Sequence, residues 1–196
     1  KTLLVSMHGK VFIEKSGDGS DKQPSKLSNP PGVRRFEFLL SSFSLPDAHE
    51  LDPTILIAIT YPVIFGMIFG DIGYGLLTAA IGLFLRVKKV GFLKDVGGMM
   101  LLSGAWTIIF GYVFGEFFGG EQMLGYHLTP IVHRSGEGIA LLFGLTLLVG
   151  VIHLGLGFLI GFVANLRAKH YGHAWAKFFW LVVEAAMVAG IYSIVF

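Results

Sequence analysis

The sequence predicts an all-α integral membrane protein: a helical bundle of about five transmembrane helices behind a short polar amino-terminal segment. Of 196 residues, 54 % are hydrophobic and 14 % are charged, and the mean hydropathy is +0.70. Soluble domains carry about 25 % charged residues, so this composition argues against a soluble globule and against a disordered chain. Glycine occurs 27 times and phenylalanine 18 times, as expected where helices pack closely in lipid.

Polarity divides the chain near residue 50. Seven of the 15 lysines and arginines come before that point, together with loop-forming sequences such as residues 16–20, SGDGS. The chain starts at Lys1 and ends within an apolar run, and no charged stretch precedes a short apolar one as in a signal peptide. We therefore expect a piece of a longer membrane protein.

Four apolar stretches are long enough to cross a bilayer, and the first is too long for one crossing. Residues 54–85 would form a helix of about 48 Å, against a hydrocarbon core of about 30 Å. Glycines and one aspartate interrupt this stretch near its middle, so we expect two short helices with a bend around residues 70–75, a tilted single helix being the alternative. The predicted spans are residues 54–69, 72–86, 96–118, 139–166 and 178–196.

The positions of the basic residues give an orientation. Lysines and arginines crowd residues 86–94 and 167–177, whereas residues 119–138 hold Arg134 as their one lysine or arginine. Basic loops lie on the cytoplasmic side of a membrane. If the amino-terminal segment and residues 86–94 are both cytoplasmic, the stretch between them crosses an even number of times. The amino terminus is then cytoplasmic and the chain crosses five times.

Four ionisable residues fall at predicted membrane depth, where each costs several kcal/mol unless it is paired or hydrated. They are Asp71, Glu116, His153 and Glu184, and they could line a polar ion pathway. Structural alternatives remain open. Asp71 could cap a turn, Glu116 could reach the interface, and a neutral His153 could bond a carbonyl, while Glu184 must find a partner or stay protonated.

Small residues recur at a spacing of four, which places them on one helix face and allows close packing. The pairs and triplet are Gly66/Gly70, Gly111/Gly115/Gly119 and Gly157/Gly161. Such stripes are typical of helix packing in general and specify no function by themselves.

Soluble enzyme chemistry finds little support. The sequence has no cysteine, no phosphate-binding glycine-rich loop, no zinc-protease motif and no nucleophile elbow. His170 and His173 form a close pair, with His127 and His133 elsewhere, but this spacing near a basic loop is more typical of solvated side chains than of a metal site. A net charge of +2 is too small to indicate nucleic-acid binding. We expect no catalytic activity of the chain alone, no cofactor and no bound metal.

Several motifs together resemble one family. Residues 30–36 (PPGVRRF) precede a short predicted helix at 37–44, Asp52, Pro53 and Thr54 lead into the membrane, and residues 61–75 read YPVIFGMIFGDIGYG. This pattern resembles the large membrane subunit, a or I, of V-type and archaeal A-type rotary ATPases. The signature positions are Asp52, Pro53, Thr54, Pro62, Gly66, Gly70, Asp71, Gly73, Tyr74 and Gly75. Residues 110–119 and 150–157 are also similar to that family.

The resemblance implies a stator subunit of an ion-translocating ATPase or ATP synthase, which forms part of two half-channels beside a proteolipid ring. Residues 1–50 would be the C-terminal tail of a cytoplasmic domain, and residues 51–196 the first part of the transmembrane domain. The implied partners are the proteolipid c-ring, peripheral-stalk subunits, a central-stalk-associated subunit and the bilayer, in an archaeal or bacterial cell membrane. The translocated ion would be H⁺ or Na⁺.

One family feature has no counterpart in the sequence. The family's essential arginine lies on a late membrane helix, and none of the predicted spans contains an arginine within it. We expect that position to lie beyond the fifth helix. Two other functions are alternatives: a secondary transporter with helices broken at residues 70–75 and 155–157, and a membrane scaffold that only positions partners.

Overall fold

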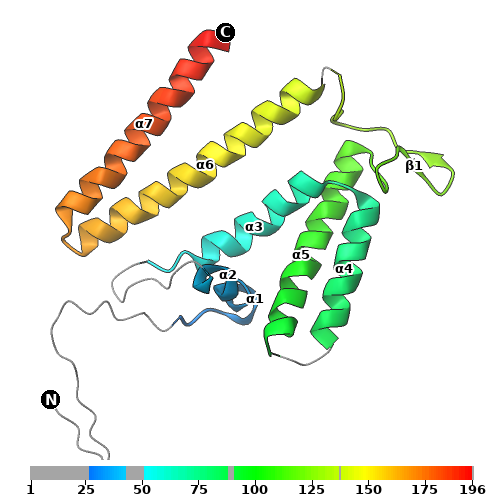
Figure 1. Ribbon diagram of the computed structural model, residues 1–196, viewed down its shortest axis with the longest axis horizontal. Coiled ribbons are helices and arrows are strands. Elements are labelled where there is room, and N and C mark those ends of the chain that lie inside the picture. Colours follow the sequence, from blue (N-terminus) through cyan, green and yellow to red (C-terminus); the bar gives the residue numbers. More distant parts are fainter. Residues whose placement is uncertain (1–26, 43–50, 88–90, 137, 196) are drawn as a thin grey trace, which may run out of the picture.

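The computed structural model describes residues 27–42, 51–87, 91–136 and 138–195 (Figure 1). Two short amino-terminal helices precede five longer ones, and a small β-hairpin lies between the third and fourth of these. The elements are α1 (Pro31–Arg34), α2 (Glu37–Ser41), α3 (Thr54–Phe69), α4 (Ile72–Val87), α5 (Gly91–Phe114), β1 (Gln122–Met123), β2 (Tyr126–His127), α6 (Gly138–Arg167) and α7 (Tyr171–Val195).

The long apolar stretch folds as two helices, as predicted. α3 and α4 have 16 residues each, and they are separated at Gly70, whose φ of 29° and ψ of 57° lie outside the helical region. Within the described residues, α5, α6 and α7 are the helices long and apolar enough to cross a membrane. α3 and α4 are about 24 Å long, somewhat shorter than a bilayer core of about 30 Å. The structure therefore gives the bend but not the count of five crossings.

α4 and α5 pack through glycines that face each other across an antiparallel pair. A Cβ on Gly104 would lie 2.7 Å from the Ala79 nitrogen and 2.8 Å from the Gly75 oxygen. A Cβ on Gly82 would lie 2.8 Å from the Gly97 oxygen, and one on Gly111 would overlap the backbone at the start of α4. These glycines recur every seven residues, a spacing that returns to the same helix face. We name the contact of Gly75, Gly82, Gly97, Gly104 and Gly111 the glycine seam.

The predicted third span continues four residues too far, because α5 ends at Phe114. Gly115 adopts a positive φ of 68°. The Glu116 N–H donates to the Gly111 carbonyl and the Gly115 N–H to the Tyr112 carbonyl, the Schellman pattern that closes a helix. Gly115 and Gly119 therefore belong to the following loop, and the expected stripe of three glycines on one helix is wrong.

The all-α expectation also misses the small antiparallel hairpin of β1 and β2. Gln122 pairs with His127, and Met123 pairs with Tyr126. Leu124 and Gly125 make the turn with φ values of 51° and 88°, the positive angles of a type I′ turn.

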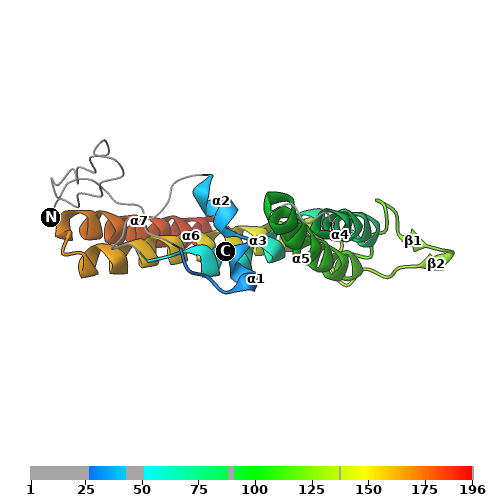
Figure 2. The same cartoon turned by 90° about the horizontal axis from the view of Figure 1, so that it is seen from below.

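α6 and α7 form an antiparallel hairpin of long helices beside the α3–α4–α5 group (Figures 1 and 2). α6 is continuous over 30 residues, so the helix break that a secondary transporter would place at residues 155–157 does not occur. α7 begins at Tyr171, seven residues before the predicted span. Aromatic rings join the two helices, with Phe158 stacked on Trp180 at 6.0 Å between centroids.

The described part of the amino-terminal segment is anchored on the membrane helices. Phe36 is fully buried and lies edge-on to the Tyr61 ring of α3. The Arg35 side chain fits against Gly98, where a Cβ would come within 2.4 Å of its Cδ. The short helix predicted at 37–44 is confirmed over Glu37–Ser41, and residues 43–50 lie outside the described part.

A polar junction links this segment to the start of α3. Asp52 accepts hydrogen bonds from the Thr54 N–H at 2.9 Å and from the Thr54 hydroxyl. The Asn29 amide donates to Asp52 at 2.7 Å and to Glu37 at 3.0 Å. Desolvation raises the pKa of the Asp52 carboxyl, but the hydrogen bonds from Thr54 and Asn29 outweigh it and leave the pKa below its ordinary value of 3.8.

Replacing Gly104 by valine should destabilise the protein by about 1–3 kcal/mol, because the added side chain overpacks the glycine seam. Thermal unfolding in detergent, followed by tryptophan fluorescence, measures the effect. Gly144→Val is the matched control, since a Cβ on Gly144 of α6 would have no other atom within 4 Å. Equal changes in unfolding temperature for the two variants would show that the glycine seam does not limit stability.

The Asp52 junction should stabilise the fold at neutral pH and lose that contribution in acid. Because the folded-state pKa lies below 3.8, the unfolded chain binds the proton more readily and stability rises with pH. The contribution is present above 3.8 and disappears as the pH falls through the lower folded-state pKa. Unfolding of wild type and Asp52→Asn across this range should converge at the acidic end. A pH-independent difference would contradict the assignment.

Candidate functional site

The four predicted ionisable residues lie in two separate places. Asp71 and Glu116 meet at one end of the α3–α4–α5 group, where the α3–α4 bend contacts the loop after α5: the Ile72 N–H donates to the Glu116 carbonyl at 2.9 Å. His153 and Glu184 lie on α6 and α7. The sequence could not indicate this division, because it depends on which helix ends come together.

Asp71 joins the first turn of α4 to the loop that follows α5. The residue is 2 % exposed. Oδ1 accepts the N–H groups of Tyr74 at 2.9 Å and Phe118 at 3.0 Å, and Oδ2 accepts the N–H of Gly119 at 2.7 Å. The carboxylate thus caps a helix and fixes a loop 47 residues further along the chain.

Glu116 forms an ion pair with Arg134 from the end of the same loop. The Arg134 guanidinium donates to Glu116 Oε2 at 2.9 Å, and both side chains are 25 % exposed. Arg134 also donates to the carbonyls of Met67 at 3.2 Å and Ile68 at 2.8 Å, in the last turn of α3. A cation is favourable at a helix carboxyl end, where carbonyls lack helical partners.

Arg134 is the residue of this cluster that sequence reasoning missed. Its guanidinium carbon lies 4.4 Å from the centre of the Phe114 ring, and a Cβ on Gly70 would lie 3.2 Å from one of its nitrogens. The indication in the sequence is that Arg134 is the one lysine or arginine of a loop that also contains acidic residues. That signal gives a charge but not its partners.

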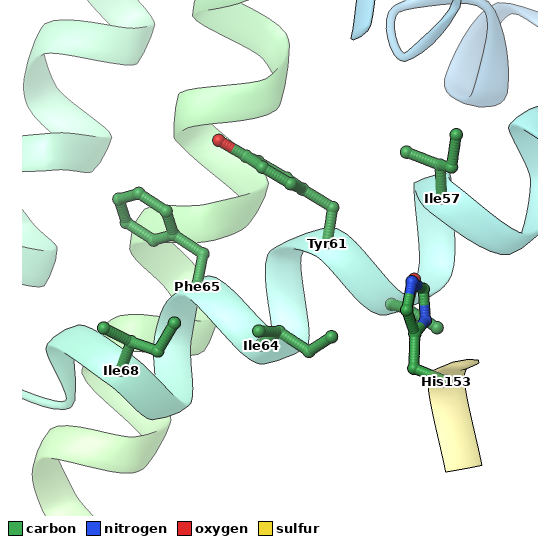
Figure 3. Close-up of a pocket in the computed structure, with 7 residues that line it drawn as sticks. Ile57, Tyr61, Ile64, Phe65, Ile68 and His153 are labelled. Carbon is green, nitrogen blue, oxygen red and sulfur yellow. The ribbon is translucent and has the colours of Figure 1, made fainter. Parts of the chain in front are cut away.

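His153 projects from α6 toward α3 and lines an apolar cavity of about 200 Å³. The other lining residues come from α3: Ile57, Thr60, Tyr61, Ile64, Phe65 and Ile68. Figure 3 shows the imidazole beside the turn that carries Ile57. Within the described residues, its buried Nδ1 has no hydrogen-bond partner.

Glu184 is half-buried in the α6–α7 contact. Its Oε2 lies 3.1 Å from the place of a Cβ on Gly155, so the carboxyl group packs on the α6 backbone. Its Oε1 is buried and has no hydrogen-bond partner among the described residues. A buried carboxylate oxygen without a partner is costly, so Oε1 needs a hydrogen-bond partner or ion from outside the described residues.

A second long side chain of α7 uses a glycine of α6 in the same way. The Lys177 Cε would lie 3.4 Å from a Cβ on Gly161, and its Nζ lies 5.8 Å from the Phe158 ring centre. Gly157 has open space around it, so the expected Gly157/Gly161 stripe does not pack as a pair. Glycines at 155 and 161 instead make room for one acidic and one basic side chain.

The histidine pair near the α6–α7 turn does not gather further ligands. The rings of His170 and His173 are 6.4 Å apart. No group of three or more potential metal ligands occurs within residues 27–42, 51–87, 91–136 and 138–195.

Asp71→Ala should destabilise the end of the α3–α4–α5 group, because it leaves buried N–H groups unpaired at about 1–3 kcal/mol each. Thermal unfolding in detergent and protease cleavage of the loop after α5 provide the readouts. Asp71→Asn retains an acceptor oxygen and should lose less. Glu121→Ala removes a largely exposed acid of the same loop and should change neither readout. If Glu121→Ala lowered stability as much as Asp71→Ala, the tethering role of Asp71 would be refuted.

Comparison with known proteins places this architecture in one family. The profile of the V-type ATPase 116kDa subunit family matches residues 20–121. An A-type ATP synthase subunit I of Archaeoglobus fulgidus is 38 % identical over 175 residues, covering 78 % of this chain and 26 % of the relative. That of Pyrococcus abyssi is 33 % identical over 159 residues, covering 79 % and 24 %.

A bacterial relative gives the same result. The V-type ATP synthase subunit I 2 of Treponema pallidum is 31 % identical over 174 residues, covering 78 % of this chain and 38 % of the relative. The chain spans only about a quarter of the length of the two archaeal relatives. With the profile match extending across the α3–α4 bend and Asp71, the chain belongs to the V-type ATPase 116kDa subunit family.

Proposed function

We propose that this chain is part of the stator membrane subunit of an ion-translocating rotary ATPase or ATP synthase, where it contributes to the half-channels beside a proteolipid ring. The names of its relatives, subunit I of A-type and V-type ATP synthases, support this proposal. The observation that carries the channel role is the pair of buried, unpartnered polar atoms that the described residues of α6 and α7 hold, His153 Nδ1 and Glu184 Oε1.

The chemistry of these two groups suits ion transfer. A carboxylate on a rotating ring needs a hydrated route through an otherwise dry bilayer, and ionisable side chains facing a cavity provide one. Imidazole and carboxyl groups can each take up and release a proton, and a carboxylate with water can also bind Na⁺. H⁺ and Na⁺ are both compatible with this pair. The chain itself catalyses no nucleotide chemistry in this proposal; ATP is hydrolysed or made elsewhere in the complex.

The helix arrangement supports five crossings with a cytoplasmic amino terminus. Arg35 lies on Gly98 near the start of α5, so this part of the amino-terminal segment is at the same end of the α3–α4–α5 group as Arg86 and Lys94. The α3–α4 bend and the loop after α5 meet at the opposite end through Asp71. α3 and α4 would then cross as a pair of short helices, and α5, α6 and α7 would follow.

The proposed partners are the proteolipid c-ring, peripheral-stalk subunits and a central-stalk-associated subunit, in an archaeal or bacterial cell membrane. Residues 1–50 would be the tail of a cytoplasmic domain that reaches the stalks, and residues 51–196 the start of the membrane domain. Asp71 and Glu116 would hold the helix ends beside the half-channel in place, since their carboxylates already bind backbone N–H groups and Arg134.

A secondary transporter is the alternative, and the helix break at Gly70 is the observation that favours it. Its expected second break is absent, because α6 continues through residues 155–157. Solute uptake by the protein alone, without ATP, would support this alternative.

In the complete complex, Glu184→Gln and His153→Ala should each lower ATP-driven ion pumping by about tenfold, equivalent to roughly 1.4 kcal/mol on the limiting barrier. ATP hydrolysis and pumping are measured in liposomes, after subunit content has been shown to be normal. Glu121→Gln, a loop acid with 61 % side-chain exposure, is the control and should pump normally. Normal pumping by both test variants at normal assembly would favour a scaffold without a channel role.

A further inference from the structure

The β1–β2 hairpin presents an apolar side chain where a turn favours other residues. Leu124 occupies the first central turn position with φ of 51° and is 88 % exposed. Asparagine, aspartate or glycine adopts this conformation at lower cost. A leucine held there in water has a strained backbone, and its side chain gains no burial in return. An apolar environment outside the described structure would offset that cost.

The two faces of the hairpin differ in polarity. Met123 and Tyr126 form one cross-strand pair, and Gln122 and His127 form the other. Because residues paired across two strands point to the same side and neighbouring residues alternate, one face is apolar and aromatic and the other is polar. Tyr126 is 76 % exposed. Met123 is half-buried, so the uncovered apolar surface in the described part of the chain consists of Tyr126 and the Leu124 tip.

The hairpin is held firmly at the level of the helix ends. The Leu128 N–H donates to the Glu121 carbonyl at 2.7 Å and closes its base, and the Ile131 N–H donates to the Val113 carbonyl of α5 at 2.8 Å. Asp71 fixes the preceding residues through Phe118. Figure 1 shows the hairpin beside the ends of α4 and α5, and Figure 2 shows it projecting outward from them.

Its surroundings carry almost no permanent positive charge. Residues 115–136 contain a single lysine or arginine, and that residue, Arg134, is bound to Glu116 and to α3. Attraction to an anionic surface therefore has no source here. Leucine and tyrosine on a sideways projection at the ends of apolar helices match the bilayer interface, where aromatic rings and aliphatic tips are anchored.

We propose that the β1–β2 hairpin is a lipid anchor, which inserts Leu124 and Tyr126 into the interfacial layer of the bilayer while Gln122 and His127 face water. The anchor fixes the non-cytoplasmic end of the α3–α4–α5 group relative to the membrane surface. It rests on the membrane placement proposed above. It differs from the ion pathway, which lies on α6 and α7.

Single spin labels provide the test, because residues 1–196 hold no cysteine and any cysteine elsewhere in the full protein is first replaced by serine. The full protein is prepared as Leu124→Cys, Tyr126→Cys and, on the polar face, Gln122→Cys, and is reconstituted in phosphatidylcholine vesicles. Collision rates with oxygen, which concentrates in lipid, and with a water-soluble nickel chelate are measured by electron paramagnetic resonance. Leu148→Cys, on an exposed position of α6, reports whether the helices are in the bilayer at all.

The labels at 124 and 126 should collide more with oxygen than with nickel, and the label at 122 should show the reverse. This difference should persist in high salt, since no charge attraction is involved. Equal nickel accessibility at 124 and 122, with Leu148→Cys protected, would overturn the anchor and leave the membrane placement intact. A label at 124 that is shielded only when the other subunits are present would also overturn it, in favour of a protein contact. Nickel access at 148 would refute the membrane placement itself.

Discussion

The carboxylate of Asp71 is the interaction on which the α3–α4–α5 group depends. A helix break leaves N–H groups and carbonyls without helical partners, and each such group that is buried unpaired costs about 1–3 kcal/mol. Asp71 accepts three N–H groups from α4 and from the loop after α5. Arg134 donates to the carbonyls at the end of α3. One acid and one base thus satisfy opposite sides of the same break, and Glu116 links this end to Arg134.

The α3–α4–α5 group and the α6–α7 pair differ in how closely their helices pack. The glycine seam brings the α4 and α5 backbones into direct contact, so that even a methyl group would collide. On α6, in contrast, Gly144, Gly150 and Gly157 face open space. The α6–α7 contact also accommodates Glu184 and Lys177. The stator role proposed for the chain would use both properties: a fixed frame, and a region where ionisable groups and water can meet a moving ring.

Sequence reasoning predicted the helices better than their contacts. The break at Gly70 and the lengths of α3, α4 and α6 follow from span length and glycine position, which are local properties. The end of α5 was missed because Gly115 reads equally well as a packing glycine or as a helix terminator. A spacing of four does not indicate the glycine seam, because its members, such as Gly97 and Gly104, are seven residues apart. The leucine turn at 124 lacks the usual hairpin residues.

Composition, length and local motifs were enough to establish that the chain is apolar and helical, where its long helix breaks, and which family it resembles. The folded arrangement was needed to show that Asp71 ties two distant segments together, that Arg134 completes the helix break, and that Glu184 and His153 retain unpaired buried atoms among the described residues. The difference arises because hydrogen-bond partners far apart in the chain are chosen by helix packing. A charged residue in a sequence indicates a need for a partner, but only the packed helices show whether that need is met.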